Sequence, residues 1–401
     1  MKFKILIILF IISISAFSQN VENVENVENF FRAENYYLNN KTDSAVNELR
    51  KNLSEVNSTV FLSKIYLKQS KTNDAIATLQ NSFKENNDKK IALELSKIYA
   101  GLAFEDEAIF WLEQYFNNNK NPLFYSQIII NQEFNNINNT QLWKDFWNTN
   151  PYPKNYSDYE NIDYLIHSTK YDEALQTLNL ISDNQYSYLK NYYLALIDYK
   201  SSDYKEAYNY INLSVQKNQN FLSAQKLKFQ IEKELKKYET AKKTAIFLLK
   251  KDSFCAENYY EKAEIQYLLK NYDESYESIN YFLNFFQSDK KALLLKSKVE
   301  IALGNKTDAL ITLNTILLDK SLNYESHLLR ANILYEYGMW DIAKNDFSMA
   351  LDVEPKNGET YYKYGMCWLN LNMTEKACYN LKKAVQLRFK KAQNPYFKNC
   401  E

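Results

Sequence analysis

A small residue recurs every 34 positions along the C-terminal half of this chain, and this period constrains the fold more than any other feature. Similar short acidic segments end in a small residue earlier in the chain, with less regular spacing. The recurring residues are Ala45, Ala75, Ala108, Ala174, Ala207, Ala241, Ser275, Ala309, Ala343 and Ala377. Five equal intervals from Ala207 onward are not expected by chance. A period in this range is typical of proteins built from stacked supersecondary units.

A second small residue lies twelve positions before the first in eight of these segments, namely Ala33, Ser63, Ser96, Ala195, Ala263, Ser297, Ala331 and Gly365. Two small residues on either side of a turn let two antiparallel helices approach closely. A large apolar residue follows four positions after the second small one at Leu49, Leu79, Leu112, Leu178, Ile211, Ile279, Leu313, Phe347 and Leu381. This i, i+4 pattern predicts one buried helix face. Further apolar residues lie eight positions after the second small one, including Leu53, Leu317 and Leu351, and we expect them to contact the neighbouring repeat.

Turn-forming residues agree with this register. Gly304 and Gly338 fall in the turn between the two helices, where a C-terminal glycine belongs. The chain has 5 Gly and 5 Pro, too few for the many turns of an all-β protein. The 34 Tyr and 23 Phe favour strands by propensity, but hydrophobic spacing is the stronger signal. The sequence therefore predicts an all-α solenoid of about eleven helix–turn–helix repeats.

The pattern resembles the tetratricopeptide repeat family. The last two repeats match its small, aromatic and proline positions best, at Ala331, Ala343, Phe347, Ala350 and Pro355, then at Tyr361, Gly365, Trp368, Ala377, Leu381 and Ala384. The resemblance covers about residues 26–390 and implies a right-handed superhelix. This chain departs from the family at the family's early tryptophan position, where most of its repeats carry a polar residue.

One repeat is degenerate. Residues 123–154 keep the repeat length, but Ile130 and Leu142 replace the two small residues. We therefore expect a hinge over 117–155. It would separate a block of about three repeats at 26–122 from one of about seven at 155–391, with a tail at 392–401.

The first 18 residues have the layout of a secretory signal peptide. Lys2 and Lys4 precede an apolar run, and Ala16 and Ser18 are the small residues before a cut at Gln19. An uncleaved anchor is the alternative. Residues 19–29 read as a low-complexity spacer. The leader and the Asn-, Lys-, Ile- and Tyr-rich composition resemble those of exported Bacteroidetes repeat proteins. We expect a periplasmic, outer-membrane-associated or secreted protein, with no transmembrane span after cleavage.

The resemblance implies that the first helix of each repeat lines a concave groove. Its groove positions correspond here to Tyr192, Tyr199, Tyr260, Tyr267, Leu328, Tyr335, Tyr362 and Leu369. Tyrosine suits recognition surfaces because it offers a large apolar ring with a polar tip. The alternative is that these rings are packing residues, since the chain has 34 tyrosines.

No catalytic, cofactor or metal site can be assembled from the sequence. The two histidines, His167 and His327, are 160 residues apart, and no phosphate-binding or nucleophile-elbow motif is present. Basic and acidic residues number 49 each, which gives no basic patch for nucleic acid. Cys378 could pair with Cys367 or with Cys400, but buried free thiols are the default expectation.

These features favour a non-enzymatic scaffold of the cell envelope that binds a protein or peptide partner. Alternatives are a sensory or regulatory ectodomain-like repeat protein and an enzyme with an unrecognised site. Pro395 argues against a further full helix after the last repeat, which would leave Cys378, Leu381 and Val385 uncovered. This uncapped face could bind a partner or a second copy of the chain. Otherwise the tail folds back over it through Tyr396 and Phe397.

Overall fold

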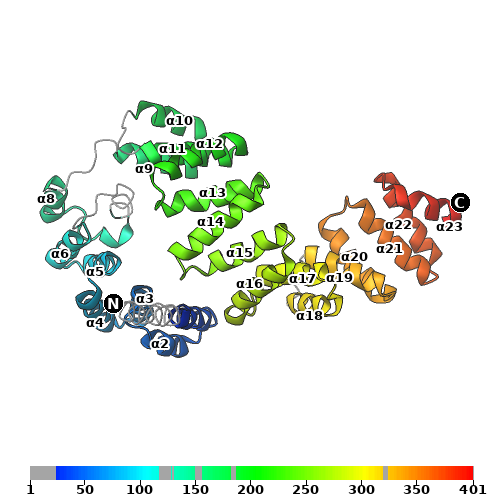
Figure 1. The fold of residues 1–401 in the computed structure, drawn as a ribbon, viewed down its shortest axis with the longest axis horizontal. Coiled ribbons are helices and arrows are strands. Elements are labelled where there is room, and N and C mark those ends of the chain that lie inside the picture. The colour runs from blue at the N-terminus through cyan, green and yellow to red at the C-terminus, as the bar shows by residue number, and fades with distance from the viewer. Residues whose placement is uncertain are drawn as a thin grey trace, which may run out of the picture. The chain divides into compact units, whose positions relative to one another are not determined.

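A computed structural model describes residues 24–116, 128, 131–149, 156–181, 187–318 and 324–400. All regular structure within these ranges is helical, and the helices alternate as paired hairpins (Figure 1). The predicted leader, the spacer up to residue 23, Ile130 and much of the predicted hinge lie outside the described residues. The chain forms two compact parts, which divide after Ala256.

The first helices of the ten complete hairpins are residues 24–38, α3 (Val56–Lys68), α5 (Lys89–Gly101), α9 (Tyr156–His167), α11 (Ser187–Lys200), α13 (Leu222–Glu234), α15 (Ala256–Leu268), α17 (Lys290–Ala302), α19 (Tyr324–Glu336) and α21 (Gly358–Asn370). The second helices are α2 (Thr42–Arg50), α4 (Thr72–Asn86), α6 (Glu105–Phe116), α10 (Tyr171–Leu180), α12 (Tyr204–Lys217), α14 (Tyr238–Lys251), α16 (Tyr272–Phe285), α18 (Lys306–Leu317), α20 (Trp340–Val353) and α22 (Thr374–Gln386). This arrangement confirms the predicted α-solenoid of tetratricopeptide-type hairpins.

The degenerate repeat retains a short 3₁₀ helix, η1 (Gln132–Phe134), and α8 (Gln141–Thr149). Leu142 lies in the first turn of α8 and is 37% exposed, so it does not replace a buried small residue at a helix contact. Within the N-terminal part, the buried residues up to Phe146 and those from Tyr159 onward form separate core clusters. The hinge and the block boundaries derived from it stay predictions.

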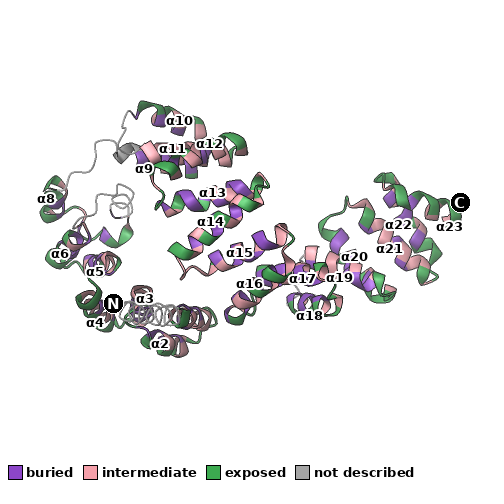
Figure 2. Cartoon of the chain, in the orientation of Figure 1, coloured by how far each residue is buried: buried purple, intermediate pink, exposed green. Residues whose placement is uncertain are grey.

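The paired small residues are buried as predicted. All ten second small residues are 0% exposed, and the first small residues are buried as well. Figure 2 shows buried and exposed residues alternating along most of the helices. Serine replaces alanine at four of these positions. Ser96 Oγ donates across the hairpin to the Ala108 carbonyl and Ser275 Oγ to the Ala263 carbonyl, both at 2.7 Å. The hydroxyls of Ser63 and Ser297 donate within their own helix, to the carbonyls of Val60 and Leu294. At Gly365, an added Cβ would lie 3.0 Å from Leu381 Cγ, so alanine would require the Leu381 side chain to shift by a few tenths of an ångström.

The apolar positions differ in how far they are buried. All nine large residues four positions after the second small one are 0% exposed, as the i, i+4 pattern predicts. The interpretation of the later positions is only partly right, since Leu351 is 8% exposed but Leu53 is 42% exposed. Leu53 lies beyond the end of α2, where its side chain reaches solvent.

The turns of the ten complete hairpins within the described residues share one backbone conformation. The residue five positions before each second small residue has a positive φ, between 57° and 85°. These residues are Asn40, Ser70, Ala103, Thr169, Ser202, Lys236, Lys270, Gly304, Gly338 and Asn372. The next residue in each turn donates its N–H to a carbonyl five positions earlier, at 2.8–2.9 Å. This is the Schellman closure of the first helix, and it makes both predicted turn glycines correct.

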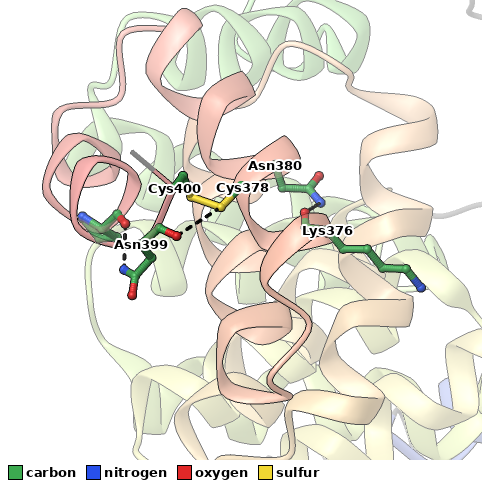
Figure 3. The surroundings of a disulfide bond; sticks show 6 residues. Lys376, Cys378, Asn380, Asn399 and Cys400 are labelled. Carbon is green, nitrogen blue, oxygen red and sulfur yellow. Dashed lines mark hydrogen bonds between the residues drawn. A yellow bond between two sulfur atoms is a disulfide. The ribbon is translucent and has the colours of Figure 1, made fainter.

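The C-terminal end is closed by a short helix. After η2 (Lys390–Ala392), α23 (Gln393–Cys400) packs on α22, and a disulfide joins Cys378 to Cys400 (Figure 3). Cys255 and Cys367 take no part in a disulfide. The default expectation of free thiols is therefore wrong for one pair. Pro395 is tolerated because it lies in the first turn of α23, where its missing N–H has no helical partner.

The prediction of an uncapped C-terminal face is corrected in part by this helix. Leu381 is fully buried inside its own hairpin, and Cys378 is covalently joined to α23. The tail folds back, as the alternative proposed, but Phe397 remains 55% exposed and Tyr396 is partly buried. The eight-residue helix is too short to cover the whole face.

Substitutions at the hairpin turns should separate backbone strain from packing. Gly304 has φ +85° and nothing within 4 Å of an added Cβ, so Gly304→Ala should destabilise by about 1 kcal/mol through backbone strain alone. Lys270→Gly should stabilise, because relief of about 1–2 kcal/mol of left-handed strain exceeds about 0.4–1 kcal/mol of added unfolded-chain entropy. Urea unfolding followed by circular dichroism measures both.

Gly101→Ala is the matched control for the glycine substitution. Gly101 also has open space around an added Cβ, but its φ is not positive. We expect it to be neutral or slightly stabilising. Equal losses for Gly304→Ala and Gly101→Ala would contradict the role of the turn conformation.

The disulfide gives a second prediction. Thiol titration of the denatured, unreduced chain should count two reactive groups, and four after reduction. Cys400→Ser should detach α23 and destabilise the last hairpin by about 3 kcal/mol, because the crosslink closes a loop with 22 residues of sequence separation. Four reactive thiols without reductant would show that the bond does not form.

Candidate functional site

The predicted groove positions lie on the first helices, and most contact a second aromatic ring. On α11, Tyr192 packs edge-on against Tyr193 and Phe221, with ring centroids at 5.2 and 5.0 Å. Burial, with a smaller contribution from Asp163, raises the pKa of Tyr192 to about 12. Tyr199 packs across the hairpin turn on Tyr204, with ring centroids at 5.6 Å.

The two predicted groove tyrosines of α15 differ in accessibility. Tyr260 is 5% exposed, and the Lys291 ammonium lies 4.1 Å from its ring centroid. Burial raises the Tyr260 pKa, with further contributions from nearby carboxylates, of which Glu264 is the largest. Tyr267 is partly buried and packs on Tyr272 across the turn at 5.8 Å. Tyr267 therefore presents more of its ring to solvent than Tyr260 does.

The remaining predicted positions are all partly buried. Tyr335 packs on Phe347 at 6.3 Å and Tyr362 on Phe389 at 5.4 Å, while Leu328 packs against the core of its hairpin. Leu369 is also partly buried. Neighbouring residues thus cover part of each of these side chains, and a partner would contact the part that remains exposed. Their role in binding stays a prediction.

Charged side chains link successive first helices in the C-terminal part, and sequence reasoning missed them. Lys291 on α17 pairs with Glu257 on α15 at 2.9 Å, and Lys298 pairs with Glu325 on α19 at 2.8 Å. Lys363 on α21 donates to Asn332 Oδ1 on α19 at 2.7 Å. The 34-residue spacing of Glu257 and Lys291 is the sequence signal that could have revealed the first pair.

Leu328, Asn332 and Lys363 come together at one small depression. With Asn357, Glu359 and Thr360, they line a hollow of about 70 Å³ between α19 and α21. Lys363 also pairs with Glu359 at 2.8 Å within α21. The structure thus brings one predicted groove residue, Leu328, next to polar groups from two successive first helices.

Two hairpins contain the same buried polar cluster on the first helix. Glu232 and Glu300 lie nine positions before the second small residue and are 0% and 1% exposed. Each accepts a hydrogen bond at 2.8 Å from a threonine of the second helix, Thr244 or Thr312. Lys228 and Lys296, one turn earlier, lie 3.8 and 3.7 Å from these carboxylates. The threonine bond and the nearby lysine hold each carboxylate within the hairpin, although Glu232 Oε1 itself accepts no hydrogen bond.

The following hairpin places its carboxylate on the second helix instead. Asp346 is 3% exposed and is contacted by Arg330 through Nε and Nη2 at 2.7 Å each. His327 Nδ1 lies 2.7 Å from Asp346 Oδ1, and Arg330 Nη1 donates to Asn314 on α18 at 2.7 Å. His327 is therefore a partly buried residue whose ring is held by the Asp346 carboxylate. Among the described residues, no group of three or more His, Cys, Asp or Glu side chains could hold a metal ion.

The last hairpin has a cleft where the preceding hairpins carry these clusters. Its lining residues are Tyr364, Trp368, Glu375, Lys376, Tyr379 and Asn380, and its volume is about 530 Å³. A second cleft of about 570 Å³ lies at the equivalent register of the hairpin α3–α4, with Tyr66 at the position of Trp368. Arg50 lines this second cleft and donates a hydrogen bond to Tyr66 Oη at 2.8 Å.

Comparison with known proteins gives distant matches. No protein-family model matches the chain. A segment of 105 residues is 29% identical to the human mitochondrial import receptor subunit TOM70, covering 24% of this chain and 17% of TOM70. The chain thus matches about a sixth of the length of that receptor.

Solved structures that align with the chain include several tetratricopeptide repeat proteins. One from Parabacteroides merdae aligns over 61% of this chain and 98% of its own, with 17% identity and a TM-score of 0.47. YrrB, described as a TPR protein with an unusual peptide-binding site, aligns over 47% of this chain and 97% of its own, with 18% identity and a TM-score of 0.39. The APC/C hetero-tetramer Cut9–Hcn1 covers 92% and 95%, with 11% identity and a TM-score of 0.48. At these levels the fold of this chain is established by its own hairpins and turns.

The buried carboxylate of α17 predicts a pH dependence of stability. Burial raises the pKa of Glu300, against the lowering effects of the Thr312 hydroxyl and Lys296. The folded pKa exceeds the unfolded one, so the stabilising contribution is complete below the unfolded pKa and is lost as pH rises through the folded pKa. Glu300→Gln, which stays neutral, should therefore gain stability relative to the parent chain as pH rises from about 4 to 8.

Urea unfolding across this pH range measures the difference between the two chains. Thr312→Val serves as a companion variant, because it removes the hydroxyl that stabilises the carboxylate form. Its stability should fall more steeply with rising pH than that of the parent chain. Parallel pH profiles for the parent chain and Glu300→Gln would contradict the effect of burial.

Proposed function

We propose that this protein is a non-enzymatic scaffold of the cell envelope, which binds a protein or peptide partner along its first helices. The observation that carries this proposal is the linked surface of α15, α17, α19 and α21. Lysine, glutamate and asparagine side chains join each of these helices to the next. Partly buried tyrosines lie on the same helices, at Tyr267, Tyr335 and Tyr362.

Such a surface suits an extended peptide for two physical reasons. The contacts between helices fix the spacing of the tyrosines before a partner arrives, which lowers the ordering cost of binding. The rings themselves are already held by neighbouring aromatic side chains, so little side-chain entropy remains to be lost. Partly exposed tyrosines of this kind are frequent at the energetic centres of protein interfaces.

Two observations support placing the scaffold in the cell envelope. The disulfide between Cys378 and Cys400 suits an oxidising compartment, because cytosolic thiols are kept reduced. The leader at 1–18 has the layout of an export signal. Within the described ranges, no helix has the length and apolar character needed to cross a bilayer.

The buried carboxylates do not support an enzymatic alternative. Glu232, Glu300 and Asp346 each bond to neighbouring side chains in the hairpin interior. A general base must lie within hydrogen-bond reach of a substrate proton, and these groups are at most 3% exposed. They therefore act in packing and not in proton transfer.

The test is affinity capture with the chain from Gln19 onward as bait, in an envelope extract of the source organism. Captured proteins are identified by mass spectrometry, and the strongest candidate is purified and titrated by calorimetry. The double variant Tyr267→Ala/Tyr335→Ala should weaken that interaction by about tenfold or more, because it removes two aromatic anchors. Lys298→Ala, which breaks the link from α17 to α19, should weaken it less.

Tyr337→Ala is the matched control, because Tyr337 is 49% exposed in a hairpin turn and lies outside the proposed surface. Its affinity for the partner should equal that of the parent chain. An identified partner that binds the double variant as tightly as the parent chain would overturn the proposed surface. A bait that retains no protein at all would overturn the scaffold function.

A further inference from the structure

The cleft of the last hairpin differs from the equivalent place in the hairpins before it. In three earlier hairpins, a cation thirteen positions before the second small residue, Lys228, Lys296 or Arg330, pairs with a buried carboxylate. In the last hairpin the same register holds Tyr364, Trp368 and Asn380. The ion pair is replaced by two aromatic rings and an amide, and the space it would fill is open to solvent.

The floor of the cleft is aromatic. Tyr364 and Trp368 lie one turn apart on α21, with ring centroids 5.9 Å apart. The Lys376 ammonium lies 4.5 Å from the centroid of a Trp368 ring, and the Lys344 ammonium of α20 lies 5.4 Å away. Lys344 also pairs with Asp341 at 2.9 Å, whereas Lys376 forms no ion pair among the described residues.

The polar groups of the cleft have unused hydrogen-bonding capacity. Asn380 is 5% exposed, and its Nδ2 donates to the Lys376 carbonyl at 2.8 Å (Figure 3). Within the described part of the chain, no donor reaches its Oδ1, so this acceptor is left for a ligand beside the aromatic floor. Glu375 adds a carboxylate acceptor, Lys376 a donor, and the 63% exposed Tyr379 a hydroxyl at the rim.

This lining disfavours most simple ligand classes. A cationic side chain would meet the ammonium groups of Lys344 and Lys376 next to Trp368. An anion would be attracted by Lys376 but repelled by the carboxylate of Glu375, the residue next to it. A purely apolar group would cover the Asn380 acceptor without bonding it, which is costly for a buried polar atom. A neutral ligand with one apolar face and a polar rim would use every group.

We propose that the cleft formed by Tyr364, Trp368, Glu375, Lys376, Tyr379 and Asn380 is a binding site for a neutral pyranose sugar. A pyranose ring presents a face of C–H groups, which stacks on Trp368, and hydroxyls that both donate and accept. Those hydroxyls bond Asn380 Oδ1 and Glu375 as donors and Lys376 as an acceptor. The lysine leaves the indole face as the sugar stacks, which its flexible four-carbon stem permits.

The size and position of the cleft agree with this ligand. A volume of about 530 Å³ falls within the usual range for small-molecule pockets. The site lies on α21 and α22 and includes none of the groove positions Tyr362, Leu369 and Leu328. Sugar binding is thus separate from the proposed peptide surface, and either can fail without the other.

The experiment is saturation-transfer difference NMR on the chain from Gln19 onward, with the methyl glycosides of glucose, galactose, mannose and N-acetylglucosamine as probes. We expect transfer to at least one probe, strongest at the C–H face of the ring. Trp368→Ala should weaken its binding by about tenfold or more, through loss of the stacking surface. Glu375→Gln, a surface change, should weaken it a few-fold and guards against a folding defect of the tryptophan variant.

Lys382→Ala is the matched control for Lys376→Ala, since both lysines are exposed on α22 and only Lys376 lines the cleft. Lys382→Ala should leave binding unchanged, and Lys376→Ala should weaken it. Absence of transfer to all four glycosides would overturn the proposal. So would binding that survives both Trp368→Ala and Glu375→Gln. Tighter binding of N-acetyltyrosine amide or arginine methyl ester than of any glycoside would assign the cleft to a peptide side chain instead.

Discussion

Close contact between two helices at a buried small residue is the interaction on which the ten complete hairpins of the described residues depend. The second small residue is 0% exposed in all ten complete hairpins, which makes it the stricter of the two positions. The first position accepts Ile162 and Phe229, both fully buried, when an alanine faces them from the second helix. One small residue, on the second helix, is therefore enough to let the two helices pack closely. The degenerate repeat has no small residue at either position, and its surviving helix α8 packs instead through Trp143 and Phe146.

This asymmetry explains how much of the fold the sequence could predict. The second small residue, the turn and the buried position four residues later all follow one period, so hydrophobic spacing locates them. The turn conformation was visible at Gly304 and Gly338 but not at Lys236 or Lys270, because lysine carries no sign that its φ will be positive. The spacing of five residues before the small one is what identifies these lysines, once the structure has shown the rule.

Features that depend on stacking were harder to predict. The link from Lys298 to Glu325 joins two repeats at a separation of 27 residues, which is not the repeat period. The cleft around Trp368 depends on the absence of an ion pair that other hairpins possess. The C-terminal helix is not predicted by the sequence pattern because proline interrupts most helices, although Pro395 lies in the first helical turn, where proline is accepted. Of the candidate groove, sequence could place the tyrosines on the first helices but not state how far each is buried.

The buried ion pairs show that the hairpin interior tolerates an exchange of charge between its helices. Glu232 and Glu300 lie on first helices, whereas Asp346 lies on a second helix, yet the partner cation keeps the same register in all three hairpins. A carboxylate at either position thus reaches the cation at the equivalent place in its own hairpin. Buried pairs of this kind add little net stability over apolar packing. Arg330 also reaches Asn314 of the preceding hairpin, so here the pair sets the register between repeats.

At the C-terminal end of the described residues, a disulfide holds the short helix α23 on the last hairpin. The residue directly after the second small one is apolar in several earlier hairpins, as at Val46 and Ile109, which are 6% and 7% exposed. In the last hairpin this position is Cys378, and no further repeat follows α22 within the described residues. The eight residues of α23 cannot bury enough apolar surface to replace a full hairpin, as the exposure of Phe397 shows. A covalent bond to Cys400 does not depend on buried area, so it can hold a cap that packing alone would leave marginal.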